Sequence, residues 1–337
     1  MDNAFPVGKL EMEFLSDLLL RYTGTDDRVA IGAKVGEDAA VVDFGDRYLV
    51  TKTNPITFAT NDIGWYVVNV CVNNMVVRGV RPRWMLNCIL LPEGQTSPEM
   101  VEDIFKQIHA ASSEVGVIVI GGHTEVTSGL DRPIVVGHLL GELSKDRLVE
   151  TSTAQVGDTL IVTKALGVEG TAIIASELSD DLANRGFSAE LIERARQFLR
   201  EPGISVYTEA LVAADSKLVS AMTDATEGGL ATALHEMAAA AGVGFLVKYE
   251  HVPLYPETQR ICTEYDLDPF GLIASGMLIM TVPVANVDEL CNKMRKEGVQ
   301  CNVIGTVTDA SEGVRLSREG KSRALPYFAA DEFTKIV

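Results

Sequence analysis

Runs of apolar and β-branched residues alternate with helical patterns of apolar positions twice along the chain. This alternation predicts a mixed α/β (α+β) architecture. In the first half the patterns predict strands at residues 39–44, 48–52, 83–91, 117–121 and 133–143, and helices at 62–78 and 98–115. In the second half they predict strands at 159–163, 244–249, 276–283 and 302–307, and helices at 170–177, 189–200, 208–214, 229–241 and 286–297.

The chain turns polar between these halves, from Thr151 to Asp158, just before the strand at 159–163. A length of 337 residues exceeds the usual size of one domain. We therefore predict two domains, at residues 1–150 and 151–337.

The composition narrows the classes of function. A net charge of -18 disfavours binding to a nucleic-acid backbone, although one nucleotide needs only a local pocket. No apolar run reaches the roughly 18 residues that span a bilayer, and Met1 to Lys9 lacks the pattern of a signal peptide. The odd number of cysteines without a CxxC pair favours reduced thiols over disulfides or zinc: Cys71, Cys88, Cys262, Cys291 and Cys301. We expect a cytoplasmic protein that binds neither nucleic acid nor membrane.

Two adjacent carboxylates, Glu37 and Asp38, follow Gly36 at a strand entrance and precede two alanines. Small neighbours let the backbone approach a ligand, and hard oxygen ligands suit a divalent cation. Taken alone, the segment also fits an ordinary acidic turn.

The helix predicted at 62–78 is apolar on nearly every side, which is typical of a buried helix. Asp62, Asn69 and Asn73 nevertheless recur along one side, with Asn74 beside them. Buried amides require partners. Two interpretations stay open: the amides form hydrogen bonds with neighbouring strands, or they face a polar ligand.

The strand at 117–121 is predicted to end in Gly121 and Gly122, followed by His123 and Thr124. A glycine-rich strand exit presents N–H groups to an anion, and the two side chains add donors. A structural histidine is the alternative.

A second candidate anion site is the loop that leads into the helix at 229–241. Asp224, Thr226, Gly228 and Gly229 place capping residues and glycines at a helix N-terminus, which suits a phosphate or a carboxylate. Glu227 disfavours an anion there, and an ordinary N-cap is the alternative. The sequence contains neither a GxxxxGK[ST] loop nor a credible strand-following GxGxxG motif, so a nucleotide would be held by another design.

Taken together, these segments resemble the superfamily of AIR synthase, which includes the hydrogenase-maturation protein HypE, selenophosphate synthetase and thiamine-monophosphate kinase. The last of these segments, from Asp224 to Leu234, is most similar to HypE. The segments that carry the resemblance are Gly36-Glu37-Asp38-Ala39-Ala40, Thr51-Lys52-Thr53-Asn54, Asp62-Ile63-Gly64, Val72-Asn73-Asn74-Met75, Gly79-Val80-Arg81-Pro82, Gly121-Gly122-His123-Thr124 and the stretch from Asp224 to Leu234.

The resemblance implies a two-domain AIR synthase-like fold. Its N-terminal domain would form a β-barrel, flanked by helices, with its twin in a homodimer, and its C-terminal domain would be an α/β sandwich. ATP and Mg²⁺ would lie in a cleft between subunits, and the γ-phosphate would pass to an amide or carbonyl oxygen of an unidentified small-molecule or protein-borne substrate.

The resemblance also assigns roles to residues. Mg²⁺ would be held by Glu37, Asp38, Asn54 and Asn74. The nucleotide would contact these four residues together with Lys9, Asn73, Gly121, Gly122, His123 and Thr124. The substrate would lie near Asp224, Thr226, Glu227, Gly228 and Gly229.

The sequence departs from its relatives in three ways. Asn54 and Asn74 stand where relatives usually carry aspartate, which should weaken magnesium binding. The sequence runs to Val337 without the terminal cysteine of HypE, and no cysteine precedes Cys71. The usual HypE reaction and selenophosphate synthesis are therefore not expected. The rival hypothesis is a degenerate member that binds a nucleotide or metabolite as a regulator or assembly partner.

Overall fold

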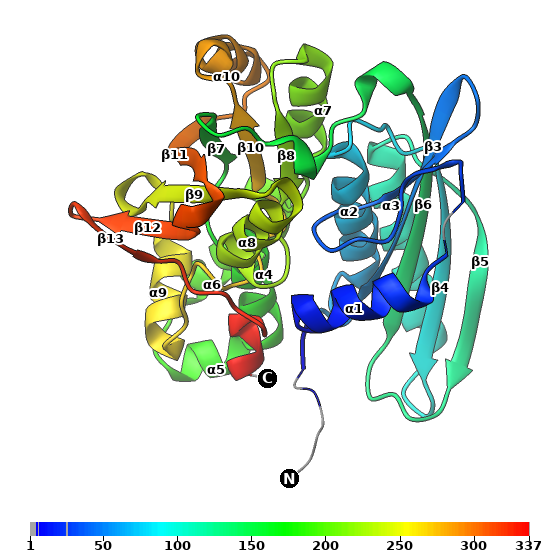
Figure 1. The fold of residues 1–337 in the computed structure, drawn as a ribbon. Helices are drawn as coiled ribbons and strands as arrows, with labels where there is room; N and C mark the ends of the chain where they lie inside the picture. The colour runs from blue at the N-terminus through cyan, green and yellow to red at the C-terminus, as the bar shows by residue number, and fades with distance from the viewer. Residues whose placement is uncertain (1–4, 6, 25, 337) are drawn as a thin grey trace.

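The computed structural model describes residues 5, 7–24 and 26–336. Part of the N-terminal segment considered above, and Val337 at the other end, lie outside these residues. The described chain contains two sheets with helices packed between and around them, as Figure 1 shows. None of its helices has the length and apolar character needed to cross a membrane.

The first sheet has six strands in the order β1-β2-β3-β6-β4-β5. Only the pairing of β4 with β5 is parallel. Within this chain the sheet is open, with β1 and β5 at its edges. The strands are β1 Val29–Ile31, β2 Ala40–Asp43, β3 Arg47–Ile56, β4 Trp84–Pro92, β5 Ile118–Thr127 and β6 Ile134–Ser144.

Two helices, α2 (Ile63–Val76) and α3 (Pro98–Glu114), cover the face of this sheet that is turned toward the second half of the chain (Figure 1). All residues of α2 are buried, as the all-round apolar pattern predicts. Ser97 caps α3 by accepting a hydrogen bond from the N–H of Met100. The helix α1 (Met12–Tyr22) precedes the sheet.

The second sheet has seven strands in the order β13-β12-β9-β11-β7-β10-β8. Its strands are β7 Thr159–Thr163, β8 Ala221–Asp224, β9 Val243–Lys248, β10 Leu278–Val282, β11 Cys301–Asp309, β12 Val314–Arg318 and β13 Lys321–Ala324. The helices of this half are α4 Val168–Glu177, α5 Ser179–Asn184, α6 Ala189–Gln197, α7 Tyr207–Ser216, α8 Gly229–Ala241, α9 Pro256–Tyr265 and α10 Val287–Lys296. The mixed α/β fold class predicted from the sequence is confirmed.

The structure corrects several predicted elements. β5 continues to Thr127 instead of ending at Gly121. The sequence patterns missed β1, β8, β12, β13, α1, α5 and α9. The missed strands have at most five residues, which is too short for apolar alternation to be distinctive.

Candidate functional site

The Glu37–Asp38 turn lies against the second half of the chain. Gly36 has φ 85°, and a Cβ atom there would come within 2.8 Å of the backbone oxygen of Glu236 in α8. Only glycine fits such a close approach in this conformation. The glycine that the sequence marks therefore sets Glu37 and Asp38 at the junction of the two halves.

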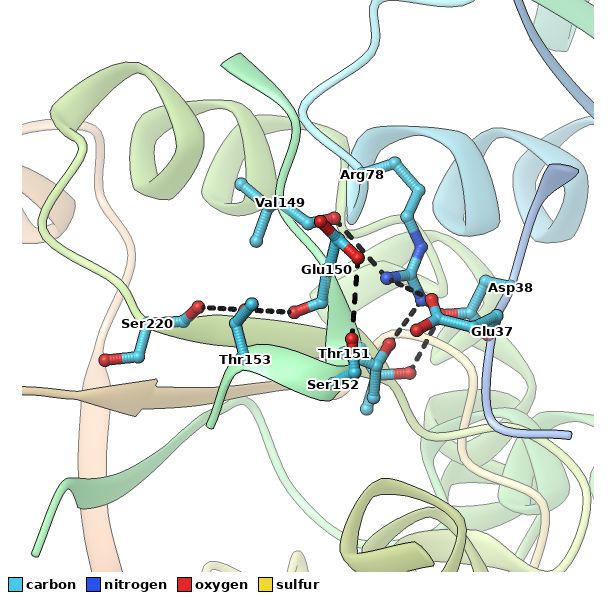
Figure 2. A network of polar contacts seen from close by, with 10 residues as sticks. Glu37, Asp38, Arg78, Val149, Glu150, Thr151, Ser152, Thr153 and Ser220 are labelled. Atoms are coloured by element: carbon cyan, nitrogen blue, oxygen red, sulfur yellow. Dashed lines mark hydrogen bonds and ion pairs between the residues drawn. The ribbon is translucent and has the colours of Figure 1, made fainter. Parts of the chain in front are cut away.

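Both carboxylates are ion-paired with Arg78, a fully buried arginine just after α2 that the sequence analysis did not select. Its Nη1 lies 2.9 Å from Oε2 of Glu37, and its Nη2 lies 2.6 Å from Oδ2 of Asp38. The guanidinium also donates to Oγ1 of Thr151 and to the carbonyl of Val149. Figure 2 shows it between these groups. The sequence did contain a signal for Arg78, because it is a lone charge at the end of an apolar helix. An arginine that is buried there needs acidic partners.

Burial and ion pairing have opposite effects on the pKa of Glu37. Burial raises the pKa of Glu37, and the nearby Arg78 guanidinium opposes that rise. Asp38 accepts a further hydrogen bond, 3.0 Å long, from Oγ1 of Thr223. Asp38 is therefore both hydrogen-bonded and ion-paired, whereas Oε2 of Glu37 has the ion pair with Arg78 but no hydrogen bond among the described residues.

The predicted magnesium ligands do not form a magnesium site in this arrangement. Glu37 and Asp38 face Arg78, and the amide Nδ2 of Asn74 donates to Oδ1 of Asp224 at 3.0 Å. Asn54 lines a separate cavity. Across the described residues, no three His, Cys, Asp or Glu side chains are grouped to hold a metal ion. The residues present do not fit the ion, because Mg²⁺ requires several oxygen ligands in near-octahedral geometry.

The other amides of α2 bind protein atoms. Nδ2 of Asn73 donates to the carbonyl of Ile204 at 2.7 Å, and its Oδ1 accepts from the N–H of Val206 at 2.8 Å. Asn69 donates to the carbonyl of Trp65 within the helix. For these two amides the hydrogen-bonding interpretation holds, although the partners are loop and helix backbone rather than strands. Asn73 thus joins the two halves of the chain.

A cavity of about 150 Å³ lies between the two halves. Several predicted site residues line it together with residues that the sequence did not indicate. Nζ of Lys9 lies 3.1 Å from Oε1 of Glu236, an ion pair that raises the pKa of Lys9 although burial opposes it. The polar lining consists of Lys9, Asn54, Thr57, Glu169, Thr226, Glu227 and Ser275.

Two buried carboxyl groups at this junction have strongly raised pKa values. Burial raises the pKa of Glu169, in the first turn of α4, to about 7. Burial and the neighbouring Asp38 raise the pKa of Asp224 to about 7. Neither makes an ion pair with another described residue. Groups that change protonation near neutral pH can act as proton acceptors or donors.

The loop before α8 binds an anion, but the anion belongs to the chain itself. The N–H of Gly228 donates to Oδ2 of Asp331 at 2.7 Å, and Oδ1 of the same carboxylate accepts from the N–H of Phe333 at 2.9 Å. Burial raises the pKa of Asp331 to about 6. The predicted carboxylate-binding geometry therefore exists, with the C-terminal segment as its occupant.

Gly121, Gly122, His123 and Thr124 lie within β5 rather than at a strand exit. The backbone of Gly122 passes so close to Asn87 of β4 that no side chain would fit, which explains the glycine without a ligand. β6 and β4 separate this edge strand from β3, at about 4.8 Å per strand. Within one chain, these four residues do not meet the Glu37–Asp38 turn. They line a separate groove of about 740 Å³ beside α3.

A further cavity of about 360 Å³ lies at the Glu37–Asp38 turn. Cations and hydroxyls accompany the acidic pair there, and Nε2 of His138 lies 3.1 Å from Oγ1 of Thr51. The polar side chains are contributed by Lys34, Glu37, Asp38, Thr51, Lys52, Thr53 and His138. This composition can bind a phosphate directly.

The chain belongs to the AIR synthase-related family. The N-terminal domain of AIR synthase related proteins matches residues 36–143, and their C-terminal domain matches residues 155–317. The chain is 29% identical over 316 residues to a hydrogenase expression/formation protein of Methanocaldococcus jannaschii, covering 91% of this chain and 90% of the relative. It is 29% identical over 306 residues to the carbamoyl dehydratase HypE of Rhodobacter capsulatus, covering 86% and 83%. It is a HypE-like member of the family.

Solved structures of HypE share the fold. HypE in complex with ATP has a TM-score of 0.65 at 21% identity, covering 95% of this chain and 92% of that one. HypE in its complex with HypF has a TM-score of 0.69 at 23% identity, covering 87% and 93%. These likenesses confirm the AIR synthase-like fold predicted from the motifs.

Proposed function

We propose that this chain binds ATP at the junction of its two domains, residues 1–150 and 151–337, and uses it to activate an amide or carbonyl oxygen. The observation that carries the proposal is the match to carbamoyl dehydratases over most of both chains. A fold neighbour that binds ATP supports the choice of nucleotide. ATP would supply a phosphoryl group that converts the oxygen into a leaving group.

In this proposal the cavity at the Glu37–Asp38 turn binds the phosphates, and the cavity between the domains binds the substrate. Lys34, Lys52 and the hydroxyls of the turn cavity bind phosphate oxygens. The cavity between the domains receives the amide, where Thr226 and Ser275 offer hydrogen bonds. Glu169 takes one proton from the amide nitrogen as the carbon–oxygen bond breaks and the oxygen leaves as phosphate, because its raised pKa makes it a usable base at neutral pH. Any Mg²⁺ is assigned to the ATP phosphates, and no step relies on an ion held by the protein.

We propose that a second copy of the chain completes the molecule as a homodimer. The edge strand β5 is exposed along nearly its whole length and presents apolar side chains, with Ile118 63% and Ile120 56% exposed. Exposed apolar edge strands are normally covered. Sedimentation should show a dimer that Ile120→Lys converts to monomers, whereas Lys106→Gln on exposed α3 should leave it intact.

The amide is proposed to be protein-borne, because a HypE fold neighbour was crystallised with a second protein, HypF. The five free cysteines support a reducing, cytoplasmic location.

A second candidate is a binder without turnover. Asn54 and Asn74 favour it, since they leave the site with two fewer charged oxygen ligands than relatives are expected to have. Release of ADP from ATP, with a carbamoylated peptide or small amide present, separates the candidates. Turnover that falls about a hundredfold in Glu169→Gln supports the enzyme. Binding of ATP without ADP release under all conditions supports the binder. Absence of ATP binding overturns the enzyme and leaves the second candidate only as a binder of another metabolite.

A further inference from the structure

We propose that Arg78 is the resident cation of the Glu37–Asp38 turn, and that this chain binds the phosphates of ATP without a metal bridge to the protein. The inference rests on the proposed binding of ATP. It goes further by assigning to a side chain the neutralising role that the family resemblance gives to Mg²⁺.

The first support is the geometry of the guanidinium. Arg78 has no solvent-exposed surface, and its two terminal nitrogens lie within 2.9 Å of Glu37 and 2.6 Å of Asp38. The same nitrogens donate to Thr151 and Val149. A planar guanidinium with fixed donors suits two adjacent carboxylates and keeps its charge at any physiological pH.

The second support is the state of the remaining predicted ligands. One oxygen of each carboxylate, Oε2 of Glu37 and Oδ2 of Asp38, is paired with Arg78, and a divalent cation beside them would be repelled by the guanidinium. Asn74 uses its amide nitrogen to bind Asp224. Asn54 and Asn74 contribute no negative charge to attract an ion. Asn74 thus lies beside this turn as a neutral amide next to the permanent positive charge of Arg78, whereas Asn54 lines the separate cavity between the halves.

The third support is the charge that the turn cavity presents to an anion. Lys34 and Lys52 line it with Glu37 and Asp38, and Arg78 lies behind the two carboxylates. With Arg78 included, cations outnumber these carboxylates by one. Asp224 lies behind Asp38 and is held by Asn74. Thr51 and Thr53 add neutral hydroxyls. Phosphate oxygens can therefore be met by side chains alone.

The test begins with the unaltered protein. Calorimetric titration with ATP in excess EDTA and in excess Mg²⁺ should give dissociation constants within about threefold of each other. Without nucleotide, Mn²⁺ titration followed by electron paramagnetic resonance should show no ion bound at a stoichiometric site. ATP binding that weakens more than about tenfold in EDTA, or a stoichiometric Mn²⁺ ion without ATP, would overturn the inference. ATP that fails to bind in either buffer would instead overturn the proposed function.

Variants then test the exchange of cations directly. The double variant Arg78→Gln, Asn74→Asp should gain a Mn²⁺ signal and require Mg²⁺ for ATP binding. Asn74→Asp alone should gain neither, because Arg78 still occupies the turn. If the single variant binds Mn²⁺ as well as the double variant does, Arg78 is not the excluding cation. If the double variant does not fold, the EDTA comparison and the Mn²⁺ titration of the unaltered protein still decide the question.

Discussion

The junction between the domains holds two sets of carboxylates that differ in their partners and in burial, since Asp38 is only part-buried. Glu37 and Asp38 share the guanidinium of Arg78. Glu169 and Asp224 are bound through N–H groups and have no ion pair in the described chain. Burial brings the pKa of each of the second pair to about 7. The guanidinium opposes the rise that burial causes in the pKa of Glu37, whereas Glu169 and Asp224 have no cationic partner to oppose it.

The largest expected effect comes from removing the cation of the first set. Arg78→Met should lower the free energy of unfolding by about 3–5 kcal/mol, because the buried Glu37 and the part-buried Asp38 lose their shared cation. Urea denaturation measures the loss. The control is Arg81→Met, three residues along, where an exposed ion pair with Asp215 should contribute about 0–1 kcal/mol. Equal losses of unfolding free energy in Arg78→Met and Arg81→Met would contradict the distinction between the buried ion pair and the exposed one.

The raised pKa of Glu169 should make the stability of the protein depend on pH. The pKa of Glu169 rises from 4.5 to about 7 on folding, so the folded chain holds this proton more tightly than the unfolded chain. The contribution of this proton to the free energy of unfolding is complete below the pKa of the unfolded chain and is lost as the pH rises through the pKa of the folded chain. The free energy of unfolding should therefore be about 3 kcal/mol lower above the folded pKa than below the unfolded pKa.

The free energy of unfolding, measured in steps between pH 4.5 and 8, should therefore fall less steeply in Glu169→Gln than in the unaltered protein. Glu190→Gln is the control, because Glu190 lies on the exposed face of α6 with 82% of its side chain accessible. If both variants and the unaltered protein show the same slope, Glu169 does not hold a proton in the folded state.

A smaller effect is expected where the C-terminal segment supplies a carboxylate. Asp331→Ala should cost about 1–3 kcal/mol, because the buried N–H groups of Gly228 and Phe333 lose their acceptor. Asp309 is a matched control, since it also caps a short helix but is exposed. Asp309→Ala should cost about 0.5–1 kcal/mol in thermal unfolding. If Asp331→Ala loses no more stability than Asp309→Ala, the burial of Asp331 does not add to the stabilising effect of its hydrogen bonds.

The sequence predicted the fold class and the two longest helices, α2 from its continuous apolar character and α3 from its apolar periodicity, but it missed the eleven-residue α1 and the ten-residue α9. It selected Gly36 to Asp38 as a candidate functional turn but could not show that Arg78 faces it, since forty residues separate Asp38 from Arg78 along the chain. Its interpretation of Gly121 and Gly122 as a strand exit was wrong. Glycines at a close strand contact and glycines at a strand end have the same sequence signature.

The missed residues Glu169 and Asp331 share one cause. Each is a single acidic residue whose meaning depends on burial against a distant segment, and local pattern carries no signal for that. A charge within an otherwise apolar helix, as at Glu169, is the one hint that the sequence offers.

The position of α2 has a consequence for how the protein opens. Every residue of this helix is buried, and Asn73 is bonded to backbone at Ile204 and Val206 in the other domain. Neither domain can separate without exposing an apolar helix surface, so the two should unfold in one cooperative transition. Backbone amides of α2 should consequently be among the slowest in the chain to exchange with deuterium, and exchange there should report opening of the whole molecule.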